Sequence, residues 1–144
     1  MSMRYYAFDD YGLVFNINHM NLLASAICND FSQEKWDNDR DYVYDCIDEV
    51  RSLFEIEYVP EFSGECFPLN DDGTNNYSNS DIITYLDGDE LWYMPSNRYP
   101  VLFKAAYNCM SDLVSEFKKC FVEYLPLDFD YRTNIKHIIG TYYG

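Results

Sequence analysis

The clearest pattern of apolar and polar positions along the chain lies between residues 39 and 55. Apolar side chains recur there at intervals of three and four residues, which places them on one side of an α-helix: Val43, Cys46, Ile47, Val50, Leu53 and Phe54. On a helical wheel at about 100° per residue, the acidic residues fall on the opposite side: Asp41, Asp45, Asp48 and Glu55. Asp37 joins them if the helix extends backwards. The pattern therefore predicts an amphipathic helix with a row of exposed carboxylates.

Two further helices are predicted, one before and one after this segment. Asn18 is a typical N-cap residue, and the apolar spacing after it favours a helix to about Phe31. Pro100 lies near the first turn of a longer helix that reaches about Tyr124, because Pro126 prevents its continuation.

Two hairpins are predicted from runs of aromatic and β-branched residues around turn-forming tetrapeptides. The first joins residues 4–8 to 13–18 through an Asp-Asp-Tyr-Gly turn. The second joins residues 82–86 to 91–94 through Asp-Gly-Asp-Glu, and Asp-Gly is a strong hairpin signal.

Two single strands complete the predicted elements. One covers residues 56–59 and ends at Pro60, and the other covers residues 135–143. Residues 70–80 are rich in Asn, Asp and Ser and are predicted to form a polar loop. Together these elements predict an α+β fold, a small and mostly antiparallel sheet packed by two or three helices. The 144 residues are expected to form a single domain, residues 1–144.

Negative charge is concentrated in the middle of the chain. The sequence has 25 Asp and Glu against 10 Lys and Arg, a formal net charge of −15. Residues 30–90 contain 18 acidic and three basic residues, so this span accounts for the whole net charge. This concentration of negative charge opposes direct binding to DNA, RNA or an anionic membrane, all of which need a cationic surface. It favours a basic protein partner.

The acidic helix carries like-charged neighbours such as Asp41 and Asp45. Pairs of this kind destabilise a helix by about 0.2–0.5 kcal/mol each, whereas a cationic partner turns the repulsion into attraction. The residues predicted to form the partner-binding acidic surface are Asp37, Asp41, Asp45, Asp48, Glu49, Glu55, Asp71, Asp72, Asp87, Asp89 and Glu90. The alternative is an acidic face that only keeps the protein in solution. The sequence leaves open whether these residues share one face.

Aromatic residues alternate with the carboxylates in the same span. Trp36, Tyr42 and Tyr44 are predicted to anchor the partner, because aromatic side chains supply a large contact area at low entropic cost and are enriched at binding hot spots. The alternative is that they pack in the core.

Catalytic and metal-binding patterns are weak. The two histidines, His19 and His137, would form an acid/base pair only if folding unites them. The acidic residues in the segment 37–48 are spaced like the ligands of a calcium-binding loop, but Tyr42 occupies the position where that loop requires glycine. We therefore predict no enzymatic activity, no metal and no cofactor.

A cytoplasmic location is expected from three features. Asp9 and Asp10 fall where a secretory signal needs an apolar run of about 7–15 residues. The apolar stretches are far shorter than the roughly 20 residues of a membrane-spanning helix. The five cysteines contain no Cys-x-x-Cys pair, which fits reduced thiols rather than disulfides or zinc.

In composition, residues 30–90 resemble the DNA-mimic inhibitors of bacteriophages and mobile elements, including antirestriction and anti-CRISPR proteins. The resemblance implies an inhibitor that occupies the DNA- or RNA-binding groove of a host defence nuclease, such as a Cas9-like CRISPR effector or a restriction enzyme. The alternative is an immunity protein or antitoxin that neutralises a basic nuclease toxin. A small enzyme and a structural or phage assembly component remain further classes. The sequence leaves the oligomeric state open, a dimer included.

Overall fold

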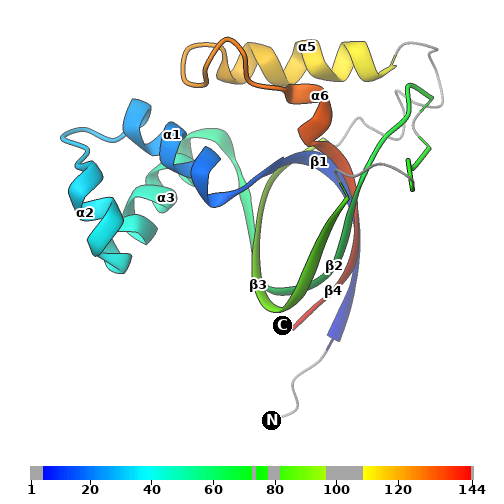
Figure 1. Ribbon diagram of the computed structural model, residues 1–144, viewed down its shortest axis with the longest axis horizontal. Coiled ribbons are helices and arrows are strands. Elements are labelled where there is room, and N and C mark those ends of the chain that lie inside the picture. Colours follow the sequence, from blue (N-terminus) through cyan, green and yellow to red (C-terminus); the bar gives the residue numbers. More distant parts are fainter. Residues whose placement is uncertain (1–4, 73, 78–81, 97–108, 144) are drawn as a thin grey trace.

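A closed antiparallel barrel forms the centre of the molecule (Figure 1). The computed structural model describes residues 5–72, 74–77, 82–96 and 109–143. Within these ranges the barrel has four strands, which neighbour one another in the order β1-β3-β2-β4. They are β1 (Tyr5–Phe15), β2 (Glu57–Pro68), β3 (Ile83–Pro95) and β4 (Ile135–Tyr143).

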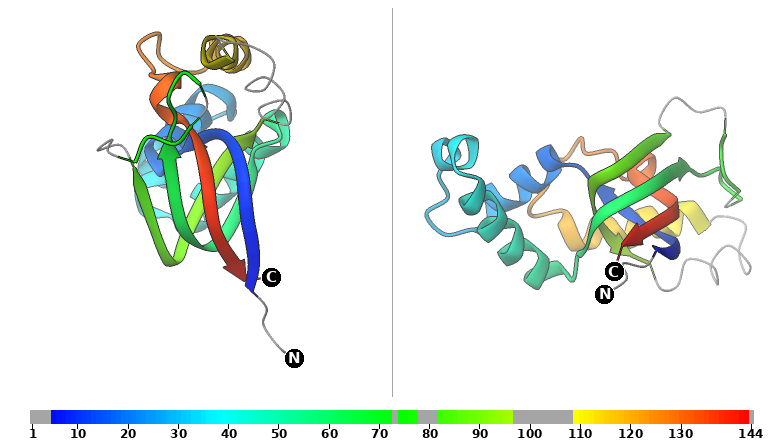
Figure 2. Two further views of the ribbon diagram at one scale, coloured as in Figure 1. Left: turned by 90° about the vertical axis from the view of Figure 1, so that its right-hand side faces the viewer. Right: turned by 90° about the horizontal axis from the view of Figure 1, so that it is seen from below.

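Helices flank the barrel in two groups (Figures 1 and 2). On one side lie α1 (Ile17–Ile27), α2 (Gln33–Asn38) and α3 (Arg40–Phe54). Across one end runs α5 (Cys109–Phe121), and the short α6 (Tyr131–Asn134) leads into β4. The predicted α+β class with a small antiparallel sheet is confirmed. In the ranges given above, no helix is long and apolar enough to cross a membrane.

α3 confirms the amphipathic helix predicted over residues 39–55. The side chain of Asp39 caps it by accepting hydrogen bonds from the backbone N–H groups of Asp41 (3.0 Å) and Tyr42 (3.3 Å). Because the backbone of Asp39 is extended, with φ −129° and ψ 104°, the same residue ends α2. The helix therefore does not extend backwards to Asp37, which belongs to α2.

α1 begins slightly earlier than predicted, because Asn16 rather than Asn18 is the N-cap. Oδ1 of Asn16 accepts a hydrogen bond from the backbone N–H of His19 (2.9 Å), and Nδ1 of His19 accepts one from the backbone N–H of Asn16 (3.2 Å). This reciprocal arrangement satisfies two donors that the helix itself leaves unpaired.

Neither predicted hairpin forms, because both expected turns lie inside continuous strands. β1 runs through residues 9–12, where Gly12 lies opposite Lys136 of β4 and opposite Pro95 of β3. Barrel closure gives β1 a partner strand on each side, and this pairing outweighs the local preference of Asp and Gly for a turn.

The Asp-Gly sequence of the second expected turn lies in an irregular part of β3. Phe62 of β2 is opposite Asp89, whereas Gly64 is opposite Tyr85. Between these pairs β3 therefore contains two residues more than β2. Such an insertion increases the local bend of a strand without reversing the chain.

β2 is longer than predicted and passes through Pro60. Pro60 lies in a second register shift of the β2–β3 pairing, between Val59 and Phe62. A proline is tolerated in a strand at such an irregularity, because it has no N–H to donate to the ladder.

The strand predicted over residues 135–143 is confirmed by β4. The second half of the helix predicted over residues 100–124 corresponds to α5. The expected start of that helix, before residue 109, lies outside the described residues. The short helix α6 was not predicted.

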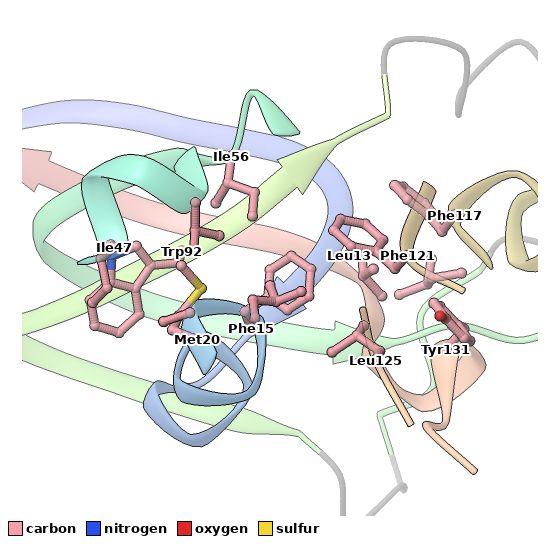
Figure 3. Packing of buried hydrophobic residues seen from close by; sticks show 14 of the residues in the cluster. Leu13, Phe15, Met20, Ile47, Ile56, Trp92, Phe117, Phe121, Leu125 and Tyr131 are labelled. Carbon is pink, nitrogen blue, oxygen red and sulfur yellow. The ribbon is translucent and has the colours of Figure 1, made fainter. Parts of the chain in front are cut away.

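Alternate residues of β1 divide the core into two parts. Leu13 and Phe15 face the helices, whereas Val14 between them faces the interior of the barrel, as the twofold alternation of a strand requires. Figure 3 shows the part beneath the helices, which extends from Met20, Ile47 and Trp92 at one end to Phe117, Phe121 and Leu125 at the other. The interior of the barrel is filled by Val14, Val59, Phe62, Cys66, Leu91, Tyr93 and Ile138.

Two glycines allow β2 and β4 to approach closely. Gly64 and Gly140 are paired across the two strands. A Cβ atom added to Gly64 would lie 2.2 Å from the carbonyl oxygen of Ile139 and 2.6 Å from Cα of Gly140. Both contacts are with backbone atoms, so the strands themselves would have to separate.

We therefore expect Gly64→Ala to lower the free energy of unfolding by roughly 1–3 kcal/mol, the usual cost of forcing extra volume into a packed site. Urea unfolding followed by circular dichroism measures this change. Ser63→Ala, at the neighbouring position of β2, is the matched control and should change stability by less than about 0.5 kcal/mol. Equal stabilities of the two variants would contradict the close approach.

Candidate functional site

α3 displays a row of carboxylates on the side away from the core. Asp41, Asp45 and Asp48, here called the α3 row, are all exposed, whereas Cys46, Ile47 and Val50 on the other side are buried. At a rise of 1.5 Å per residue, the row extends over about 10 Å. Its acids follow one another at successive turns of one rigid element.

The α3 row is mostly unpaired. Arg51 lies 3.6 Å from Asp48, but the side chains are 32% and 71% exposed, and pairs of this kind contribute little. Within the described part of the chain, Asp41 and Asp45 form no ion pair. Their charge is therefore available to a partner.

A cleft of about 900 Å³ lies between the α2–α3 segment and β3. Its helical wall consists of Trp36, Asp37, Asn38, Asp39, Arg40, Val43 and Tyr44. Its strand wall consists of Ile83, Thr84, Tyr85, Asp89, Glu90 and Trp92. The junction between β1 and α1 closes it with Phe15, Asn16 and Ile17. Aromatic rings and carboxylates thus dominate one concave site.

The carboxylates of the cleft are held by uncharged donors. Oδ1 of Asp37 accepts a hydrogen bond from Nε2 of Gln33 (3.0 Å), and Oδ2 of Asp89 accepts one from the backbone N–H of Leu86 (2.7 Å). Asp39 is oriented by its capping bonds to α3. These contacts fix the direction of each carboxylate but leave its charge unneutralised.

Glu90 is the most constrained carboxylate of the cleft. Its Oε1 accepts hydrogen bonds from the hydroxyl groups of Tyr44 (2.5 Å) and Tyr58 (2.7 Å), so it connects α3 to β2 and β3. The hydrogen bond to Glu90 is the main reason that the pKa of Tyr44 is raised. Burial first, and Glu90 second, raise the pKa of Tyr58. Both tyrosines therefore remain protonated donors at neutral pH.

Arg40 supplies the positive charge among the residues that line the cleft. Its guanidinium carbon lies 5.4 Å from the centre of the Tyr44 ring, a cation–π distance. A hydrogen bond to Tyr44 is the main cause of the raised pKa of Arg40, and the charge of Glu90 adds to it. Four acidic residues and one arginine leave the lining with a net negative charge.

Trp92 carries an unsatisfied donor in the strand wall. Its side chain is 5% exposed and stacks on Tyr58, with ring centres 5.9 Å apart and planes inclined by 19°. Within the described ranges, its Nε1 is a buried side-chain atom without a hydrogen-bond partner. An unpaired buried donor is uncommon in a folded protein and costs free energy.

The cleft unites five of the residues predicted from the sequence to bind a partner: Trp36, Asp37, Tyr44, Asp89 and Glu90. Tyr42 instead points towards the start of α2, where its hydroxyl accepts a hydrogen bond from the backbone N–H of Ser32 (2.7 Å). All three predicted aromatic anchors are partly buried. Two of them, Trp36 and Tyr44, present part of their surface to the cleft.

The remaining predicted acids lie elsewhere. Glu49 lies near Cys28, the C-cap residue of α1, where burial first and Glu49 second raise the pKa of the thiol. Glu55 ends α3 in a left-handed conformation with φ 56°. Asp71 and Asp72 follow β2 on the far side of the barrel from α2 and α3 (Figure 1). Asp71 is paired there with Arg132 of α6. The side chain of Asp87 lies outside the described residues. The acidic residues therefore do not form one continuous face.

The two histidines take part in separate sets of contacts. His19 belongs to the capping box of α1. His137 lies on β4, with Nε2 2.6 Å from Oδ1 of Asp9 and Nδ1 3.0 Å from Oδ1 of Asn75. Among the described residues, no group of three or more His, Cys, Asp or Glu side chains is placed to hold a metal ion.

Several cleft residues were missed in the sequence, above all Tyr85 and Trp92 of β3. The predicted hairpin placed them in two short paired strands, and neither was counted among the predicted site residues. Their bulky aromatic character was the available signal, but only the continuous course of β3 places both beside α2 and α3.

A scan against models of protein families, a search of curated proteins and a search of solved structures each find no match to this chain.

Replacing Glu90 tests the central contact of the cleft. We expect Glu90→Gln to lower the pKa of Tyr44 towards its ordinary value, because the hydrogen bond to the carboxylate is the main cause of the shift. The pKa of Tyr58 should fall less, because burial contributes more there. NMR titration of protein labelled at tyrosine Cζ, above about pH 8, measures both values.

The same change affects stability at high pH. A tyrosine whose folded-state pKa is raised stabilises the protein fully below its unfolded value of about 10 and loses this contribution as the pH rises through the folded value. The stability of the wild type should therefore fall more steeply above about pH 10 than that of Glu90→Gln. Asp48→Asn, outside the cleft, is the control. An unchanged Tyr44 titration in Glu90→Gln would refute the assignment.

Proposed function

We propose that this chain is an acidic, nucleic-acid-mimicking inhibitor that occupies the DNA- or RNA-binding groove of a basic protein, a host defence nuclease in particular. The α3 row carries this proposal. It presents three exposed carboxylates on one rigid helix, two of them without an ion pair in the described part of the chain. Asp41 lies in the first turn of α3, where the helix dipole favours a negative charge, but Asp45, one turn further along, has no comparable role within the described part of the chain.

The spacing of the α3 row supports the comparison with a phosphate backbone. Along the helix axis, Asp41 and Asp45 are separated by about 6 Å, and Asp45 and Asp48 by about 4.5 Å. Along one strand of DNA the charges repeat about every 3.4 Å. A groove lined with Lys and Arg that binds phosphates would therefore meet charges of the same sign at comparable intervals.

The net charge of −15 adds a long-range electrostatic attraction towards a basic partner. A strongly negative protein is attracted to a basic groove before contact, which raises the association rate at low salt and makes binding sensitive to ionic strength. The same charge opposes direct binding to nucleic acid or to an anionic membrane. The proposed partner is thus a basic protein, in the cytoplasm of a bacterial host.

Neutralising the α3 row tests the proposal. We expect the triple variant Asp41→Asn, Asp45→Asn, Asp48→Asn to bind the nuclease roughly 10–100-fold more weakly, from about 0.5–1 kcal/mol per lost contact. The partner is first captured from a lysate of the natural host at low and moderate salt. It is then purified, and its dissociation constant and the inhibition of its nuclease activity are measured.

The matched control is Asp112→Asn, Glu123→Gln, Asp128→Asn, which changes the net charge equally at exposed positions on and after α5. It should retain binding, and DNA or RNA should displace the wild type from the nuclease. If both triple variants lose the same affinity, net charge alone determines binding and the position of the α3 row does not matter. Unchanged binding by the α3 variant, or capture of no nucleic-acid-binding protein, would overturn the proposal. Capture of a dedicated nuclease toxin would instead identify an immunity protein.

A further inference from the structure

The residues that line the cleft carry a net negative charge, as a cation-binding site requires. Asp37 and Asp39 approach it from the helical wall, and Asp89 and Glu90 approach it from the strand wall. Each carboxylate is oriented by a neutral donor, so its charge is retained and its direction is fixed. A ligand that carries phosphate would be repelled from such a site.

Aromatic rings give the cleft flat, apolar surfaces. Trp36 and Tyr44 belong to the helical wall, and part of the Trp36 ring is exposed there. In the strand wall, Trp92 is 5% exposed and Tyr85 packs on Phe62. The faces of aromatic rings attract cations, and a planar guanidinium stacks on them better than a compact ammonium does. The combination of rings and carboxylates therefore favours arginine over lysine.

Arg40 shows how a guanidinium is accommodated at the edge of the cleft. Its guanidinium carbon lies 5.4 Å from the centre of the Tyr44 ring, and its charge is favoured by Glu90. Asp37 and Asp89 have no ion-pair partner among the described residues, so a second guanidinium has carboxylates left to pair with.

The strand wall also contains a donor that lacks an acceptor. Nε1 of Trp92 is buried and unpaired within the described ranges. An arginine side chain has no acceptor atoms, but the polypeptide that carries it has backbone carbonyl groups. Such a carbonyl is the kind of acceptor that Nε1 lacks.

We propose that the cleft receives an arginine side chain presented by an extended segment of the protein partner. The guanidinium pairs with Asp37 and Asp89 and stacks on Trp36. This inference names the partner chemistry of the proposed function and rests on it for the identity of the protein that presents the arginine. The cleft itself is separate from the α3 row.

The two tryptophans of the chain provide a direct measurement. The sequence contains two tryptophans, and both line the cleft. Their fluorescence therefore reports on occupancy without any label. The probe is the end-blocked peptide Gly-Gly-Arg-Gly-Gly. The comparison peptides carry citrulline, which has nearly the same shape without the charge, or lysine.

We expect the arginine peptide to change the fluorescence saturably, with a dissociation constant of about 0.1–1 mM for one anchored side chain. The citrulline peptide should produce no saturable change, and the lysine peptide should bind at least about threefold more weakly. The double variant Asp37→Asn, Asp89→Asn should weaken binding of the arginine peptide about tenfold. At each position asparagine keeps one acceptor oxygen for the hydrogen bond from Gln33 or Leu86 and removes the charge.

Asp45→Asn, Asp48→Asn is the matched control, because it removes the same charge from the α3 row and leaves the cleft intact. It should bind the arginine peptide with less than about a twofold loss. Equal binding of the citrulline peptide, an unaltered affinity in the cleft variant, or no saturation would each overturn the arginine site.

Failure of the arginine site is distinguishable from failure of the proposed function. If the peptide does not bind but the α3 triple variant still loses the nuclease, the cleft assignment is wrong and the proposed function stands. If the peptide binds as expected but no nucleic-acid-binding protein is captured, the arginine site stands and the mimicry of nucleic acid is wrong.

Discussion

Closure of a barrel with only four strands is the constraint on which the rest of the structure depends. Each strand must pair on both sides, and so few strands close only when each bends strongly. The register shifts of β2 and β3 and the close contact of Gly64 with Gly140 are where this bending is accommodated. The bent β3 presents Trp92 to the helices, and the cleft forms where α2 and α3 meet this strand.

Elements fixed by their own periodicity were predictable from the sequence. The apolar spacing of α3 and the compact apolar run of β4 gave both elements almost to the residue. The hairpins were wrong because Asp and Gly favour turns and bulges alike, and only the partner strands decide between the two. No local signal shows that residues 9–12 pair with β4 and that Gly12 pairs with β3 as well.

The candidate site was predictable in composition but not in arrangement. Charge counting found the acidic span, and the helical wheel found the α3 row. The capping role of Asp39 then turns Trp36 and Asp37 away from that row and into the cleft. The segment after β2 that contains Asp71 lies on the other side of the barrel from the cleft (Figure 1). Which acidic residues lie side by side depends on the tertiary structure, and their spacing along the sequence does not determine it.

The capping box of α1 makes one edge of the cleft responsive to protons. Nδ1 of His19 accepts the backbone N–H of Asn16 only while the imidazole is neutral. Burial lowers the pKa of His19, so the neutral form is favoured in the folded protein. The stabilisation that comes from neutral His19 is present above its unfolded-state pKa near 6.5 and is lost as the pH falls through its lower folded-state pKa. Because Asn16 and Ile17 line the cleft, acidification loosens the backbone at its edge.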